Sequence, residues 1–106
     1  MAKKARRVRS LVAEVHRLKG KRKGGVLKDE AWGEDGQVVA YNLTYINRRI
    51  CRVDHGRVLG YDNSHGYHHR HFMGKTEPVE YVSYDALTEH FYQELHELWR
   101  VEDAED

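Results

Sequence analysis

Four of the eight histidines of this 106-residue chain lie within one short segment, His65-Gly-Tyr-His-His-Arg-His71. Histidine can donate and accept protons near neutral pH, and neutral imidazole is also the commonest metal ligand. An arginine lies inside the segment, and Asn63 lies just before it. The segment therefore predicts proton-transfer chemistry or a bound metal. The arginine and the asparagine favour phosphate or RNA as the substrate.

Metal-free cleavage of RNA needs a base, an acid and a cation that stabilises the charge developing on the phosphate. We expect His69 and His71 to be the acid–base pair, and Arg70 to be the cation. In an extended segment both histidines would share one face and Arg70 would lie on the other, whereas a loop would bring all three together. Asp62 is expected to orient an imidazole. The remaining catalytic candidates are Asn63, His65 and His68.

A metal site is the alternative use of the same side chains. His65, His69 and His71, with Asp62 or Glu77, offer enough ligands for a three-histidine site or for a site of two histidines and one carboxylate. The spacing of the carboxylates is loose, so the metal-free interpretation, which needs no cofactor, is preferred. A non-catalytic module that binds nucleic acid or protein is a further alternative.

The charge of the chain is unevenly distributed. Residues 1–23 carry ten Lys or Arg and one acid, whereas the remainder carries eight Lys or Arg and sixteen acids. Such asymmetry indicates a segment that contacts nucleic acid or an acidic partner. Aromatic side chains near the histidines would stack on bases. The expected RNA-binding residues are Tyr61, Tyr67, Lys75, Arg6, Arg7 and Arg9.

Length and composition are typical of one reduced, cytoplasmic domain. The single cysteine, Cys51, excludes an intramolecular disulfide and a cysteine-rich zinc site. No apolar stretch approaches the roughly 18 residues of a membrane span, and the basic N-terminus is not followed by the apolar region of a secretory signal.

Hydrophobic spacing predicts the secondary structure. Residues 5–19 carry apolar side chains at helical spacing and are expected to form an amphipathic helix with a basic outer face. Alternation predicts strands at 26–32, 39–45, 49–53 and 57–62, and a short fifth strand at 79–82. The histidine segment is expected to leave the sheet. Ser83 is a suitable N-cap for a C-terminal helix whose apolar positions are Leu87, Phe91, Leu95 and Leu98.

The expected fold is α+β. An antiparallel meander sheet of four to five strands would pack against the C-terminal amphipathic helix, with an additional basic helix at the N-terminus. The expected organisation is a basic N-terminal arm over residues 1–24, a single α+β catalytic domain over 25–101 and an acidic tail over 102–106.

The segment Gly60-Tyr-Asp-Asn-Ser-His-Gly-Tyr-His-His-Arg-His71 resembles the TumE-type toxins of toxin–antitoxin modules. In that pattern a strand ends in Tyr-Asp-Asn, a glycine follows, and a His-Arg-His triplet leads to a second glycine, here Gly74. The resemblance covers roughly residues 37–98. The chain departs from the pattern before the triplet, where Tyr67-His68 replaces a longer spacer with Lys-Gly-Asp. The basic N-terminus also lies outside the pattern.

The resemblance implies a ribonuclease-like toxin that is restrained by a cognate antitoxin, a helix-turn-helix protein encoded beside it. RNA and the antitoxin are therefore the expected partners. The sequence leaves self-association open, as well as which histidine is the acid and which is the base.

Overall fold

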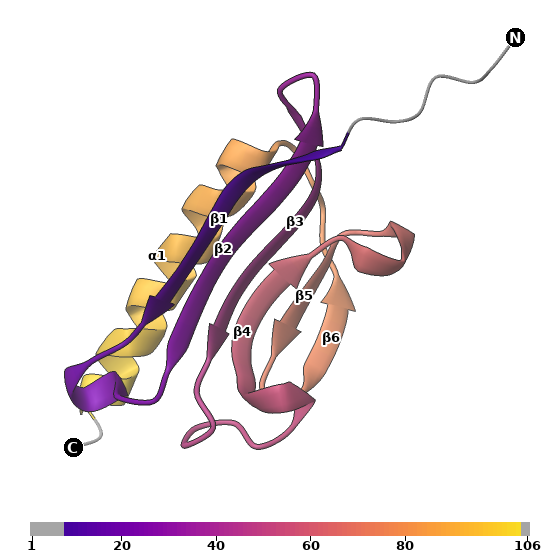
Figure 1. The fold of residues 1–106 in the computed structure, drawn as a ribbon. Coiled ribbons are helices and arrows are strands. Elements are labelled where there is room, and N and C mark those ends of the chain that lie inside the picture. The colour runs from indigo at the N-terminus through magenta and orange to yellow at the C-terminus, as the bar shows by residue number, and fades with distance from the viewer. Residues whose placement is uncertain (1–7, 105–106) are drawn as a thin grey trace, which may run out of the picture.

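A computed structural model describes residues 8–104 of the chain. Within these residues the fold is a six-stranded antiparallel meander sheet followed by one helix, with the strands in sequence order (Figure 1). The strands are β1 (Arg9–Arg17), β2 (Val26–Glu34), β3 (Gln37–Ile46), β4 (Arg57–Asp62), β5 (His69–Phe72) and β6 (Lys75–Pro78), and the helix is α1 (Tyr84–Ala104).

The core lies between α1 and one face of the sheet (Figure 1). Alternate residues of β3, namely Tyr41, Leu43 and Tyr45, are buried there, as the period of a half-buried strand requires. The helix contributes a buried stripe of Leu87, Phe91 and Leu95. The hydroxyls of Tyr84 and Tyr92 also donate to Asp29 of β2, so polar contacts fix the helix on the sheet.

Several elements confirm the sequence predictions. Strands β2, β3 and β4 and helix α1 lie where alternation and helical spacing placed them. Ser83 caps α1, because its Oγ accepts a hydrogen bond from the amide of Ala86 at 3.1 Å. Within residues 8–104, no helix combines the length and the apolar character that a membrane crossing needs.

The predicted N-terminal helix is wrong. Residues 9–17 form β1, which pairs with the outer edge of β2, and residues 5–7 of the predicted helix lie outside the described part of the chain. The apolar positions of the predicted helix are only partly used for packing: Val12 and Leu18 pack against the core. Val8, Leu11 and Val15 remain 44, 43 and 53 % exposed. Pairing with the free edge of β2 satisfies the backbone of both segments, and this tertiary effect outweighs weak helical spacing that is rich in β-branched valine.

The predicted number of strands was also wrong, because residues 8–104 form six strands rather than four to five. Residues 49–53 form a turn region, in which the Asn47 carbonyl accepts from the amides of Ile50 and Cys51. Over the histidine segment, the chain leaves the sheet only between β4 and β5, and the second half of the segment returns to it as β5. The last strand is Lys75–Pro78 rather than 79–82.

Candidate functional site

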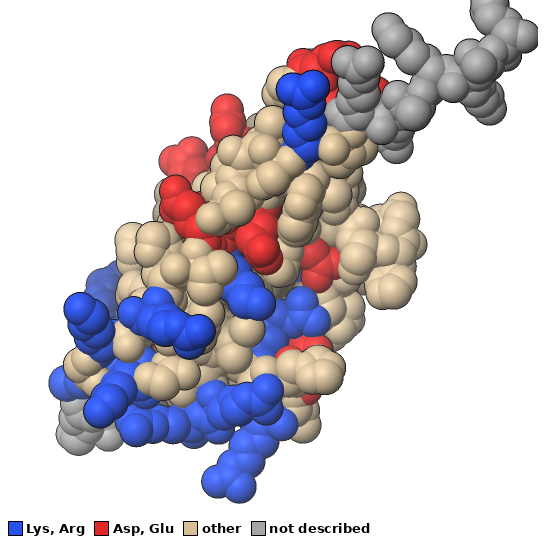
Figure 2. Space-filling view, in the orientation of Figure 1, with Lys and Arg blue, Asp and Glu red and all other residues tan. Residues whose placement is uncertain are grey.

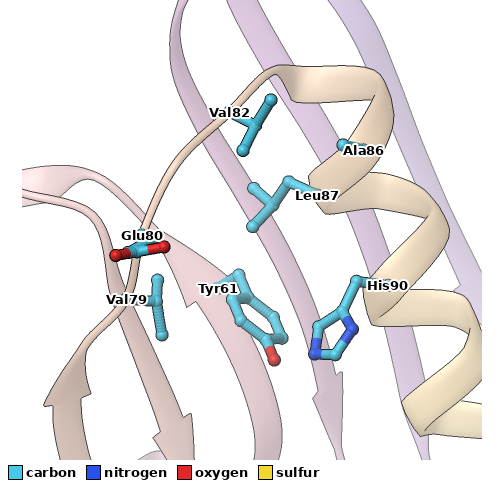
Figure 3. A pocket seen from close by; sticks show the side chains of 7 residues that line it. All are labelled: Tyr61, Val79, Glu80, Val82, Ala86, Leu87 and His90. Atoms are coloured by element: carbon cyan, nitrogen blue, oxygen red, sulfur yellow. The ribbon is translucent and has the colours of Figure 1, made fainter.

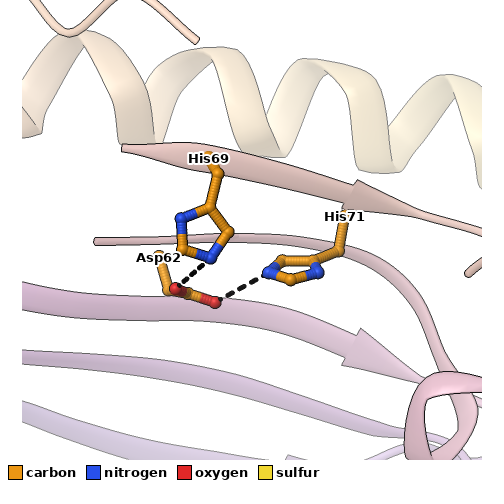
Figure 4. Close-up of side chains that lie close together, drawn as sticks. All are labelled: Asp62, His69 and His71. Atoms are coloured by element: carbon orange, nitrogen blue, oxygen red, sulfur yellow. Dashed lines mark hydrogen bonds and ion pairs between the residues drawn. The ribbon is translucent and has the colours of Figure 1, made fainter. Parts of the chain in front are cut away.

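Asp62, His69 and His71 converge on the face of the sheet opposite α1 (Figure 4). Asp62 ends β4 and is paired directly with His69 of β5, while His71 is paired with Gly60. His69 Nε2 lies 2.8 Å from Asp62 Oδ1, and His71 Nε2 lies 3.1 Å from Asp62 Oδ2. All three residues are buried, with exposed fractions of 7, 2 and 8 % in chain order. One carboxylate thus connects two imidazoles.

His69 is held by contacts at both of its ring nitrogens. Nδ1 lies 2.9 Å from the carbonyl oxygen of Tyr67, and Nε2 faces the Asp62 carboxylate. Both partners are acceptors, so both contacts are hydrogen bonds only when both ring nitrogens carry a proton. Both ring nitrogens of His69 therefore face hydrogen-bond acceptors.

His71 is in a different environment. Burial lowers the pKa of His71 below its ordinary value of 6.5, and the positive charge of Arg57 lowers it further, against the opposing effect of Asp62 and Asp54. Its Nδ1 lies 3.2 Å from Thr76 Oγ1, a hydroxyl that can donate to it. A neutral ring with its proton on Nε2 then donates to Asp62. The two histidines therefore have different hydrogen-bond partners, although they share one carboxylate.

Asp62 remains ionised at the centre of the group. Burial alone would raise its pKa, but hydrogen bonds from Ser64 and the charges of His69 and His71 outweigh burial, so the pKa of Asp62 lies below its ordinary value. The Ser64 amide and hydroxyl donate to Oδ1 at 3.1 and 2.8 Å. A carboxylate held in this way can orient both imidazoles.

Arg57 is the cation of this face, and sequence reasoning missed it. Its Nη1 lies 3.1 Å from Asp62 Oδ2, and its Nε and Nη2 donate to Asp54 at 2.8 and 3.0 Å. These bonds hold the pKa of the Asp54 carboxyl below its ordinary value. In a regular strand, residues 57 and 62 would face opposite sides. A register shift between β3 and β4 leaves Val58 unpaired and turns Arg57 to the side of Asp62, which alternation alone could not reveal.

Arg70, the cation predicted from sequence, lies on the other face. It donates through Nε to Glu94 of α1 at 3.2 Å and through Nη1 to Glu77 at 3.2 Å. Its hydrogen bond to Glu94 raises the pKa of Arg70. Tyr61 lies on the same side and donates to Glu94 at 2.7 Å. The structure therefore separates Arg70 and Tyr61 from the two histidines.

The other catalytic candidates lie around the group rather than in it. Asn63 bonds the backbone of β3, donating to the Val39 carbonyl at 2.9 Å and accepting from the Tyr41 amide at 3.1 Å. His68 stacks on Tyr81 at 3.9 Å between ring centroids and contacts the Tyr41 hydroxyl at 2.8 Å. His65 is exposed, with its ring 6.5 Å from that of His69.

The predicted RNA-binding residues are dispersed. Tyr67 is exposed, and its ring lies 4.6 Å from that of His69, so it borders the group. Lys75 is exposed at the start of β6, and Arg9 is exposed at the start of β1. Arg6 and Arg7 lie outside the described residues.

Two hollows lie near Asp62, His69 and His71, one on each face of the sheet. One, of about 340 Å³, is on the side of Asp62 and is lined by Trp32, Val39, Ala40, Tyr41, Asn42, Asp62, Asn63 and Ser64. The other, of about 280 Å³, lies between α1 and the segment before it and is lined by Tyr61, Val79, Glu80, Val82, Ala86, Leu87 and His90 (Figure 3). The first hollow is lined by both Asp62 and Trp32, and the Trp32 side chain is a base-sized aromatic surface.

Asp62, His69 and His71 also have the composition of a metal site. Their ligand atoms lie within 4.8 Å of one another, in a set of two histidines and one carboxylate. His69 Nδ1 faces the Tyr67 carbonyl, as the second nitrogen of a metal-bound histidine commonly does. Of the two alternative ligand sets, the structure brings together two histidines and Asp62 rather than three histidines, because His65 is exposed outside the group. Glu77 contacts Arg70 on the other face.

The comparisons with known proteins add no assignment. No protein-family model matches the chain, and neither the curated proteins nor the solved structures that were searched include a match.

Proposed function

We propose that the protein is a ribonuclease-like toxin that cleaves RNA by metal-independent acid–base catalysis. The observation that carries the proposal is the pairing of two imidazoles on one buried carboxylate, beside an arginine. Two titratable groups in different environments are typical of an acid and a base that act together, and burial lowers the pKa of His71. The toxin role, the cytoplasmic setting and the helix-turn-helix antitoxin rest on the TumE-type resemblance.

The proposed reaction is an internal transfer within RNA. Neutral His71 removes the proton of a 2′-hydroxyl, and the resulting 2′-oxygen forms a bond to the adjacent phosphorus. The bond from phosphorus to the 5′-oxygen breaks, and the His69 imidazolium donates a proton to that leaving oxygen. The products are a 2′,3′-cyclic phosphate and a 5′-hydroxyl, so atoms and charge balance without a co-reactant.

Arg57 and Asp62 complete the proposed machinery. The Arg57 guanidinium stabilises the negative charge that develops on the phosphate, because planar N–H donors match phosphate oxygens. Asp62 is the positioning residue, since it accepts from both imidazoles and holds their orientation. The hollow beside Asp62 gives an RNA base a place next to Trp32.

RNA cleavage in excess EDTA tests the proposal. Purified wild-type protein is expected to cleave single-stranded RNA in the chelator, and His71→Gln is expected to lose about a hundred- to ten-thousand-fold in rate. His96→Gln is the matched control, because His96 is exposed on α1, away from Asp62. Expression of the wild-type protein and of His96→Gln is expected to arrest growth, whereas expression of His71→Gln is not. Absence of cleavage under all conditions would instead favour a non-catalytic binding module.

A metal-dependent enzyme is the second candidate, and the orientation of His69 toward the Tyr67 carbonyl favours it. Asp62, His69 and His71 would hold the ion, which would supply Lewis-acid activation. In that case cleavage is lost in EDTA and restored by an added divalent transition metal. The acid–base proposal expects that neither EDTA nor the added metal changes the rate of cleavage.

A further inference from the structure

Two connections at one end of the sheet carry a dense group of positive charges. The β1–β2 connection and the β3–β4 connection lie at the same end, and Figure 2 shows Lys and Arg gathered there, with Asp and Glu concentrated toward the other end. We define the basic end by its exposed side chains, Arg17, Lys19, Lys21, Lys23, Arg48, Arg49 and Arg52.

The two connections of the basic end contain few acidic residues of their own. Residues 17–25 and 47–56 together contain one acid, Asp54, and Asp54 is already bonded to Arg57. Across residues 8–104, Arg48, Arg49 and Arg52 have no ion pair with a carboxylate. Concentrated charge of one sign attracts a polymer of the opposite sign.

Local contacts fix the two connections in place. Arg22 anchors the β1–β2 connection to the end of α1, donating to the Trp99 carbonyl at 3.0 Å and to Asp103 at 3.1 Å. Asn47 anchors the other connection, because its amide donates to the Gly56 carbonyl at 2.8 Å and its Oδ1 accepts from the Arg49 amide at 3.1 Å. The charged side chains are therefore presented from defined backbone positions.

The basic end is continuous with the candidate site. Arg48 packs over Gly56, where an added Cβ would lie 2.7 Å from Arg48 Cγ. Gly56 immediately precedes Arg57, whose guanidinium reaches Asp62. The β5–β6 turn joins the same region, because a Cβ at Gly74 would lie 2.5 Å from Val53 Cγ2. A chain of phosphates along the basic end would thus lead directly to Arg57.

We propose that the basic end binds the phosphate backbone of single-stranded RNA and guides it to Arg57 and His71. The identity of the polymer as RNA rests on the proposed function. Residues 17–25 and 47–56 contain no Phe, Tyr or Trp, so this surface contacts phosphates rather than stacking on bases. Binding is therefore independent of base sequence and strongly dependent on salt.

The test measures the affinity of a labelled single-stranded RNA of about 12 nucleotides across a series of salt concentrations. The measurement uses the His71→Gln background so that cleavage does not interfere. Replacing Arg48, Arg49 and Arg52 together by Gln is expected to reduce the slope of log affinity against log salt by about two, at roughly 0.7 per phosphate contact. The matched triple Lys variant keeps the charges and is expected to keep the slope.

An unchanged slope and affinity in the triple Gln variant would overturn the proposal, as would wild-type affinity that does not depend on salt. Preferential binding of a polyglutamate peptide over RNA would also overturn it, and would assign the basic end to an acidic protein partner. Cleavage is measured separately with His71 intact. If the protein cleaves RNA and the three arginines do not affect binding, only the proposal for the basic end is refuted. If the arginines are needed for RNA binding and no RNA is cleaved, only the proposed function is refuted.

Discussion

Arg57 reaches across Gly60 to Asp62, and its Nη1 lies 3.1 Å from Asp62 Oδ2. Arg70, although it lies between the two histidines in sequence, contacts Glu94 on the opposite face. The arginine that lies beside the two histidines in space is therefore Arg57, and not Arg70, which lies between them in sequence. For this reason we assign the proposed phosphate-binding role to Arg57.

Arg57→Gln is expected to lower the rate of RNA cleavage by about a hundredfold or more, because it removes the donors aimed at the developing phosphate charge. Arg70→Gln is the matched variant and is expected to retain the rate while lowering stability through the loss of its Glu94 and Glu77 contacts. Single-turnover cleavage and thermal unfolding separate the two effects. Equal loss of rate in both variants at full folding would contradict the assignment.

Gly60→Ala is expected to disturb the site through a steric effect. A Cβ at residue 60 would lie 2.7 Å from Arg57 Cδ and 2.9 Å from Thr44 Oγ1, closer than ordinary contact. Displacing Arg57 should lower the cleavage rate, and overpacking should cost about 1–3 kcal/mol of unfolding free energy. Gly36→Ala provides the comparison, because nothing lies within 4 Å of its added Cβ, although its positive φ also carries a backbone cost. A fully active Gly60→Ala protein would show that the Arg57 position is not needed.

The dependence of stability on pH should report the burial of His71. Its folded-state pKa is lowered, so the unfolded chain binds the proton more readily than the folded protein does. The resulting stabilisation is fully present above the unfolded pKa of about 6.5 and is lost as pH falls through the folded pKa. Denaturant unfolding of wild type and His71→Gln should therefore give a stability difference that shrinks below about pH 6.5. A difference that is constant with pH would argue against a neutral, buried His71.

The packing of α1 on the sheet predicts a large and local stability effect. Phe91 is fully buried and contacts the Tyr61 and Tyr92 rings edge-on. Phe91→Ala should cost about 3–5 kcal/mol of unfolding free energy. Val82→Ala is the control and should change stability little, because Val82 is 84 % exposed. A small effect at Phe91 would mean that α1 does not pack as described.

Part of this structure was accessible from the sequence, and the limits have physical causes. Strands β2 to β4 and helix α1 were predicted because their apolar residues face one core. Strand β5 was missed because its buried side chains are His69 and His71, which a hydrophobicity pattern does not count as buried. Strand β1 was assigned as a helix because its fold depends on the distant edge of β2.

The site shows the same division. His69, His71 and Asp62 were identified as candidates, and the structure brings them together. Arg57 was missed because a register shift turns it toward Asp62. Asp54 and Thr76 were missed because they contact His71 only in the folded chain. Residue types can indicate the chemistry of the site, but the positions of bulges and turns decide which cation lies beside the histidines.

The ends of the cleaved RNA test the central claim most directly. In excess EDTA, wild-type protein should leave a 2′,3′-cyclic phosphate on one fragment and a 5′-hydroxyl on the other. A substrate with one 2′-deoxy nucleotide at the cleaved position should resist cleavage there. Both results are predicted because His71 is proposed to activate the 2′-hydroxyl itself. Cleavage of the 2′-deoxy substrate, or a 5′-phosphate product that appears only with added metal, would contradict the acid–base account.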